Sequence, residues 1–117
     1  MTDLQAIRQY RDVANWYEFL YFMKQPRIFW DSRKIMEQLE ERRQRHMREA
    51  ERTMRQAERA LNSLPRKEWR DAMIQRYILQ RNHLEAAEAM NYCETSVRRY
   101  EYAAIKHLEA REALKRL

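Results

Sequence analysis

The sequence predicts an all-α protein, with an N-terminal helical hairpin in residues 1–64 and a smaller set of helices in residues 65–117. The 117 residues include no glycine and only two prolines, Pro26 and Pro65, and good helix formers such as Arg, Glu, Ala, Leu, Met and Gln dominate. A sheet protein of this length would need several tight turns with positive φ, most of which require glycine. A chain of this length forms one domain, or a small domain with a helical extension.

The first helix is expected to begin at a cap on Thr2 or Asp3 and to end near Lys24, ahead of Pro26. Its apolar residues recur at steps of three and four, as on one helix face: Leu4, Ile7, Tyr10, Val13, Ala14, Tyr17, Leu20 and Tyr21. The same stretch and the loop after it carry an aromatic cluster: Trp16, Tyr17, Phe19, Tyr21, Phe22, Phe29 and Trp30. A membrane-surface face or a partner-binding patch would explain these rings. Burial against the next helix is favoured, because the C-terminal part alone is too small to build a sufficient core.

A loop over residues 25–30 and a cap at Asp31 or Ser32 lead into a second helix from about Arg33 to Leu64. Its apolar positions follow two heptad series, interrupted once by Arg43: Met36, Ala50, Ala57 and Leu64 in one, and Met47, Met54 and Leu61 in the other. Alanine and methionine dominate, which makes this seam thin and adaptable. A hairpin within the chain and a coiled-coil homodimer would both use it, and a homodimer built on the second series is expected.

The second helix also carries a run of arginines: Arg42, Arg43, Arg45, Arg48, Arg52, Arg55 and Arg59. Glutamates are interleaved with them, several at a spacing of three or four residues: Glu40, Glu41, Glu49, Glu51 and Glu58. This spacing favours ion pairs along a solvated helix face. A phosphate-tracking role is the less favoured alternative. The formal net charge of +6 favours a polyanionic partner without naming one.

After Pro65, an apolar stripe predicts a helix over residues 66–79: Trp69, Met73, Ile74, Tyr77 and Ile78. Asn82 then stands three residues before Glu85, which is the spacing of a capping box, and opens a short helix through Met90. Asn91 is the residue best suited to the left-handed conformation that ends a helix. Two helices joined by a turn of three residues are therefore expected here.

Cys93 takes the place of a serine cap for the final helix, which runs from Glu94 towards Leu108. One face of this helix is expected to pack on the core: Val97, Tyr100, Ala104 and Leu108. The opposite face holds groups suited to contact DNA: Thr95, Arg99, Tyr102 and Lys106, flanked by Ser96 and Arg98. A short helix, a turn and a longer helix are the geometry of the helix-turn-helix, and the small Ala87 suits a close crossing of the two helices.

The segments 64–65, 73–77, 84–92, 97–99 and 104–108 together resemble sigma-70 region 4, and most of all its form in small phage regulators of the RinA and ArpU type. The resemblance covers about 45 residues. It implies base-reading positions at Glu94, Thr95 and Arg99 and a phosphate contact at Arg98. Because the three base-reading residues differ from those usual in the family, the target sequence is expected to differ as well.

The resemblance implies sequence-specific binding to double-stranded DNA and a role in regulating transcription of phage or prophage late genes. In this hypothesis Arg98 and Lys106 hold phosphates, and Thr95, Ser96 and Arg99 read bases in the major groove. Tyr102 would pack on a sugar or a thymine methyl group, although an ordinary surface role is favoured for it. Two alternatives stay open. One is a DNA-packaging subunit similar to a phage small terminase, and the other is a helical module that contacts RNA polymerase or a sigma factor.

No enzymatic activity is expected of this chain. Cys93 is the only cysteine and has no convincing catalytic base near it, and a chain without glycine has no phosphate-binding glycine loop. His46, His83 and His107 share no ligand spacing, so neither a metal nor a cofactor is expected. Nothing resembles a signal peptide or a membrane span, which makes the cytoplasm the expected compartment.

Overall fold

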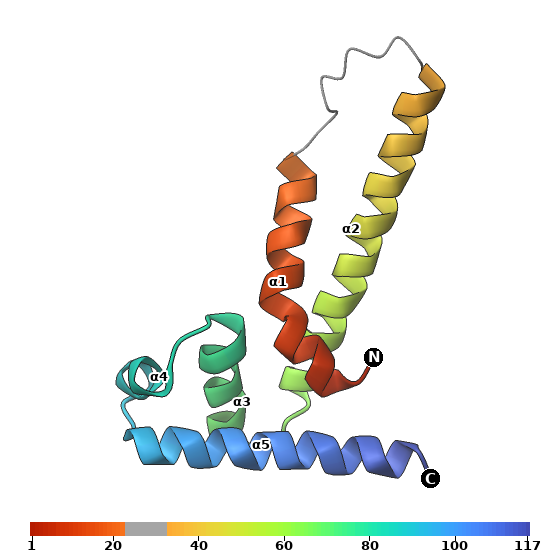
Figure 1. Ribbon diagram of the computed structural model, residues 1–117. Coiled ribbons are helices and arrows are strands. Elements are labelled where there is room, and N and C mark those ends of the chain that lie inside the picture. Colours follow the sequence, from red (N-terminus) through yellow and green to blue (C-terminus); the bar gives the residue numbers. More distant parts are fainter. Residues whose placement is uncertain (23–32) are drawn as a thin grey trace.

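The computed structural model describes residues 1–22 and 33–117, and within these ranges all regular structure is helical. The elements are α1 (Asp3–Phe22), α2 (Arg33–Asn62), α3 (Lys67–Met73), the π-helical stretch η1 (Ile74–Ile78), α4 (His83–Met90) and α5 (Glu94–Lys115). The prediction of an all-α protein is confirmed. Figure 1 shows α1 and α2 side by side as an upright pair whose base meets α5, while α3 and α4 lie over the N-terminal part of α5.

Helix α1 begins with a reciprocal cap at Thr2. Its hydroxyl accepts a hydrogen bond from the Gln5 backbone N–H at 3.1 Å, and the Gln5 side chain accepts one from the Thr2 N–H at 2.8 Å. Thr2 is therefore the cap, and Asp3 is the first helical residue. The expected end near Lys24, the loop over residues 25–30 and the caps at Asp31 and Ser32 lie outside the described residues.

The apolar seam of α2 faces α1 within the same chain. Its buried residues are Met47, Ala50, Ala57, Ala60 and Leu61, and Leu64 is buried just beyond the end of the helix. Met36 and Met54 are half-buried. Of the two uses of the seam, the structure shows the hairpin. A homodimer through the same residues would therefore require α1 to dissociate from α2.

The main hydrophobic core lies at the base of the hairpin and includes residues from both sides of Pro65. Ile7 of α1, Leu61 of α2, Met73 of α3 and Leu108 of α5 belong to one buried cluster. Trp69, Ile74, Tyr77 and Ile78, all predicted in the apolar stripe, are partly buried against it. The stripe is thus confirmed as a packing face, and it links the hairpin to the later helices.

Asp3 adds a polar tie to this base. It accepts a hydrogen bond from Gln56 at 3.1 Å and pairs with Arg111 at 3.0 Å, and Arg111 also donates to Ser63 at 2.7 Å. Burial raises the pKa of Asp3, but the Gln56 hydrogen bond and the charges of Lys115 and Arg111 outweigh it, so the pKa lies below its ordinary value. The Asp3 carboxylate therefore connects the start of α1 with the C-terminal parts of α2 and α5.

The aromatic cluster of α1 is largely exposed, which corrects the prediction of burial against α2. The exposed fractions are 47% for Trp16, 50% for Phe19, 46% for Tyr21 and 73% for Phe22. Tyr17 is half-buried, whereas Phe29 and Trp30 lie outside the described residues. The reason is helical geometry: Phe19 and Phe22 lie away from the face of α1 that packs on α2, and Trp16 lies at the edge of that face, where its ring centre is 6.4 Å from that of His46 of α2. The number of aromatic residues alone did not reveal which of them are exposed.

The arginine run of α2 also differs from expectation. Arg43 pairs with Glu40 at 3.2 Å and Arg55 with Glu51 at 3.3 Å. Within the described residues the other five make no ion pair: Arg42, Arg45, Arg48, Arg52 and Arg59. In water an exposed pair gains little and loses side-chain entropy, so spacing in the sequence is not sufficient to form it. Ion pairs along this face are therefore confirmed for Arg43 and Arg55, and the other five arginines form none within the described residues.

Candidate nucleic-acid interface

The segment before α4 ends in a widened turn that the sequence did not predict. Helix α3 continues into η1, where the Leu79 N–H donates to the carbonyl of Ile74, five residues earlier, at 3.0 Å. Gln80 then takes a left-handed conformation with φ of 52°, and the Arg81 N–H donates to the Gln75 carbonyl at 2.9 Å. This reversal delivers the chain to the start of α4.

Both ends of α4 follow the local chemistry predicted from the sequence. The Asn82 side chain accepts from the Glu85 N–H at 2.8 Å, and the Glu85 carboxylate accepts from the Asn82 N–H at 3.1 Å, which completes the capping box. At the other end Asn91 is left-handed with φ of 59°, and the Tyr92 N–H donates to the Ala87 carbonyl at 3.1 Å. These two predictions are confirmed.

Cys93 stands at the cap position of α5, as predicted, but it does not act as a serine would. Its side chain makes no hydrogen bond to the helix backbone, and its sulfur lies 3.1 Å from the Ser96 hydroxyl. This contact lowers the pKa of the Cys93 thiol. Ser96, a candidate base reader, is half-buried and shares its hydroxyl with this contact.

Small residues let α4 pack closely against its neighbours. Ala72 of α3, Ala86 and Ala87 of α4, and Val97 of α5 form a second buried cluster. Tyr100, predicted on the core face of α5, is half-buried beside this cluster and in edge contact with the Tyr92 ring at 5.4 Å. A larger side chain at either alanine of α4 would push this helix away from α5.

Glu101 is the polar centre of this unit, and sequence reasoning missed it. It is 8% exposed, and its carboxylate lies 2.6 Å from His83 Nε2. Tyr77 donates to it at 2.9 Å and Arg76 at 3.2 Å. Through these contacts one side chain of α5 fixes both η1 and the first residue of α4.

The charge on Glu101 is stabilised by its partners. Burial raises its pKa, but hydrogen bonds from His83 and Tyr77 and the charge of Arg76 outweigh the burial, so the pKa lies below its ordinary value. A signal was present in the sequence: Glu101 lies four residues after the buried Val97 and seven before the buried Leu108, on the same helix face, where an acidic residue requires partners.

The outer face of α5 carries the predicted DNA-contacting residues. Thr95 and Arg99 are exposed, and within the described residues Arg99 makes no ion pair. Arg98 is paired with Glu94 at 2.7 Å. Farther along, the Lys106 ammonium lies 5.4 Å from the centre of the exposed Tyr102 ring and 3.6 Å from Glu109. The structure thus gathers the predicted residues on the outer side of one helix, with Ser96 at its edge.

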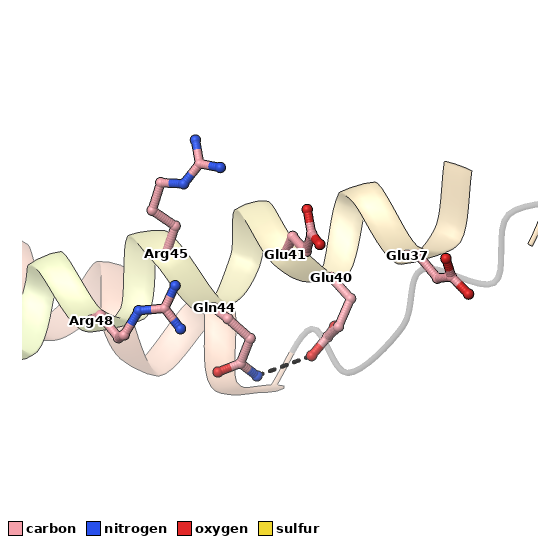
Figure 2. A pocket seen from close by; sticks show the side chains of 6 residues that line it. All are labelled: Glu37, Glu40, Glu41, Gln44, Arg45 and Arg48. Carbon is pink, nitrogen blue, oxygen red and sulfur yellow. Dashed lines mark hydrogen bonds between the residues drawn. The ribbon is translucent and has the colours of Figure 1, made fainter. Parts of the chain in front are cut away.

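A hollow of about 550 Å³ lies far from this face, along the distal part of α2. Figure 2 shows its six lining side chains: Glu37, Glu40, Glu41, Gln44, Arg45 and Arg48. All come from one helix, and no nucleophile stands beside a base among them. Within residues 1–22 and 33–117, no three His, Cys, Asp or Glu side chains gather so as to hold a metal ion. Among the described helices, none combines the length and apolar character needed to cross a membrane.

Comparisons of this chain with protein-family models, with curated proteins and with solved structures each find no match.

Proposed function

We propose that this protein is a sequence-specific DNA-binding regulator of transcription, acting in the cytoplasm on phage or prophage late genes. In this proposal α4, the turn at Asn91 and α5 form a helix-turn-helix similar to that of sigma-70 region 4. The observation that carries it is the outer face of α5, where Arg99 is exposed and without an ion partner within the described residues, beside the exposed Thr95. The capped, closely packed α4 supports that face from behind.

The proposed mechanism places α5 in the major groove. Arg99 has the geometry to donate two hydrogen bonds to a guanine edge, which contributes about 1–3 kcal/mol of discrimination between base pairs. Thr95 and Ser96 add shorter contacts to bases. Lys106 holds a phosphate, and the Tyr102 ring beneath its ammonium restricts where that charge lies.

Arg98 has a conditional part in this mechanism. In the free protein it is held by Glu94 at 2.7 Å, so a phosphate must compete with that carboxylate. Glu94 also stands in the first turn of α5, where its negative charge repels a nearby phosphate. Binding of α5 to phosphates alone is therefore weakened relative to binding in which α5 also contacts base edges.

A test of the proposal measures fluorescence anisotropy with DNA fragments flanking the gene and with a scrambled duplex, over a series of salt concentrations. We expect Arg99→Ala to weaken binding to the cognate fragment by roughly 10- to 100-fold and to change scrambled binding little. The matched control is Arg116→Ala, at the far end of α5, which removes the same charge without touching the proposed reading face. Equal binding of all fragments by every variant would contradict the proposal.

We also propose a homodimer, because one helix-turn-helix offers few contacts and two symmetric copies would read two half-sites. Sedimentation of the protein with and without its DNA fragment tests this directly. A single monomer on DNA at working concentrations would remove the dimer and leave the proposed reading face intact.

The exposed rings of α1 favour one alternative function, a module that contacts RNA polymerase or a sigma factor. The rings of Trp16 and Phe19 stack with their centres 5.4 Å apart, and both are about half exposed, although Trp16 also meets His46 of α2. Capture of purified polymerase by the full chain, lost in the double variant Trp16→Ala, Phe19→Ala and kept in Arg99→Ala, would favour this alternative.

A further inference from the structure

One face of α2 carries charges that the proposed reading face does not use. Here the arginine stripe means five residues of α2: Arg45, Arg48, Arg52, Arg55 and Arg59. They follow one another at steps of three and four, so they lie on one side of the helix. All five are exposed, and the buried Met47, Ala50 and Ala57 lie on the other side, against α1. At 1.5 Å per residue the stripe is about 21 Å long.

The charge of the stripe is largely uncompensated. Arg55 pairs with Glu51 at 3.3 Å, but within the described residues the other four make no ion pair. Glu37 and Glu41 lie on this side of α2 but precede the stripe, whereas Glu49, Glu51 and Glu58 flank it. Figure 2 shows Arg45 extended away from the helix with no partner drawn, while nearby Glu40 accepts a hydrogen bond from Gln44 at 3.0 Å. From residue 45 to residue 59 this side of α2 is therefore a row of cations.

The composition of the row identifies the kind of partner. The centre of a protein-protein interface is typically apolar and depleted in charge. The other positions on this side of α2 over residues 44–59, Gln44 and Gln56, are polar, so no apolar side chain interrupts the stripe. Interfaces with DNA are far more positively charged, and a duplex carries phosphates along its whole length. Arginine adds a planar fork that donates two hydrogen bonds to one phosphate.

We propose that the arginine stripe binds the phosphate backbone of duplex DNA without reading its sequence, as a second site separate from α5. Figure 1 shows α2 leading away from α5, so the stripe extends away from any short duplex that lies along the outer face of α5. The stripe therefore holds a different segment of DNA from the one that α5 contacts. This inference does not depend on α5 reading DNA.

The test uses a duplex of random sequence, about 20 base pairs long, and measures its affinity by anisotropy over a salt series. The stripe variant is Arg45→Gln, Arg48→Gln, Arg52→Gln; glutamine keeps helix propensity close to that of arginine, and none of the three has an ion partner to lose within the described residues. The control variant changes charge equally at exposed positions off the stripe: Arg11→Gln, Arg33→Gln, Arg42→Gln. Both are also made in an Arg98→Ala, Arg99→Ala background, which removes the two arginines of the proposed reading face.

We expect the stripe variant to reduce the slope of log K against log salt by about 2–3, in both backgrounds, because three phosphate contacts are lost. The control variant should leave the slope within about 1 of its parent. Persistence of stripe-dependent binding in the Arg98→Ala, Arg99→Ala background would support the second site even if the reading face fails its own test. Equal losses in the stripe and control variants, or none in either, would overturn the inference. A competition experiment tests the assignment to nucleic acid. If a polyglutamate peptide of equal charge displaces the labelled duplex as effectively as unlabelled DNA does, that assignment is overturned.

Discussion

The two regions of this molecule are held together by different chemistry. The unit of α3, η1, α4 and α5 has a small core of alanines and one valine, and it also holds the buried carboxylate of Glu101, which contacts Arg76, Tyr77 and His83. The pair of α1 and α2 has a seam of methionine, alanine and leucine with no comparable buried charge among its described residues. The first region is positioned by a buried network of directional contacts. The second is positioned mainly by apolar area, with partly exposed hydrogen bonds such as that from Gln56 to Asp3 beside it.

The difference matters for function because directional contacts fix angles and apolar area does not. A helix that reads base edges must be held at a defined angle, and the contact of Glu101 with His83 sets α5 against the start of α4. A surface that follows phosphates tolerates small shifts, which suits the adaptable seam behind the arginine stripe. The base of the hairpin joins both regions through one cluster that includes Leu61 and Met73.

The largest effect is expected for Leu61→Ala, which leaves a cavity at this shared base. We expect a loss of about 3 kcal/mol in the free energy of unfolding, because the site is closely packed from several helices. Urea unfolding of this variant, followed by tryptophan fluorescence and by far-ultraviolet circular dichroism, should show the same midpoint with both probes. Leu114→Ala, at an exposed leucine, is the matched control and should cost under about 0.5 kcal/mol. Two separate midpoints would show that the regions unfold independently.

Glu101→Ala is expected to cost about 2–3 kcal/mol, because it leaves Arg76, Tyr77 and His83 without their shared acceptor. Glu94→Ala removes another carboxylate from α5, one whose pair with Arg98 is exposed, and should change stability by less than about 0.5 kcal/mol. The measurement is urea unfolding at neutral pH. Similar losses in the two variants would mean that the buried network is no stronger than a surface pair.

Acid should weaken both regions, through one carboxylate in each. The pKa values of Asp3 and Glu101 are lower in the folded protein than their ordinary values. Their contribution to stability is therefore complete above the unfolded pKa values, near 4, and is lost as pH falls through the folded values. We expect Asp3→Asn and Glu101→Gln each to reduce the loss of stability between pH 5 and pH 3, as measured by thermal unfolding. A Glu101→Gln protein that is as acid-sensitive as the parent would refute the role of Glu101.

Local rules predicted much of the region formed by α3, η1, α4 and α5. The capping box at Asn82 and Glu85 and the left-handed Asn91 depend on residues within one turn of each other, so a short window of sequence contains all the information. The helix content and the seam of α2 were also predictable, because a repeat of three and four is a property of one helix.

Features that depend on two distant elements were not predictable. Glu101 gains its partners only when α5 meets η1 and α4, and the exposure of Phe19 and Phe22 depends on which side of α1 meets α2. Which arginines of α2 would be paired was also not predictable, since spacing allows an ion pair but solvation decides whether it forms. The shared exposure of Thr95, Arg99 and Lys106 was predictable, because their spacing of four and seven residues is a property of one helix.

The smallest changes in the free energy of unfolding are expected for substitutions at the caps of α4 and α5. Asn82→Ala should cost about 1 kcal/mol, because the Glu85 N–H loses its acceptor and the reciprocal bond is weakened. Cys93→Ala should cost less than about 0.5 kcal/mol, because the Cys93 side chain makes no hydrogen bond to the backbone of α5. Cys93→Ser, measured by the same urea unfolding, should raise stability by a few tenths of a kcal/mol, since a hydroxyl is a preferred cap. If Cys93→Ala matches Asn82→Ala instead, the thiol is already stabilising the start of α5, and the contact with Ser96 has a structural role.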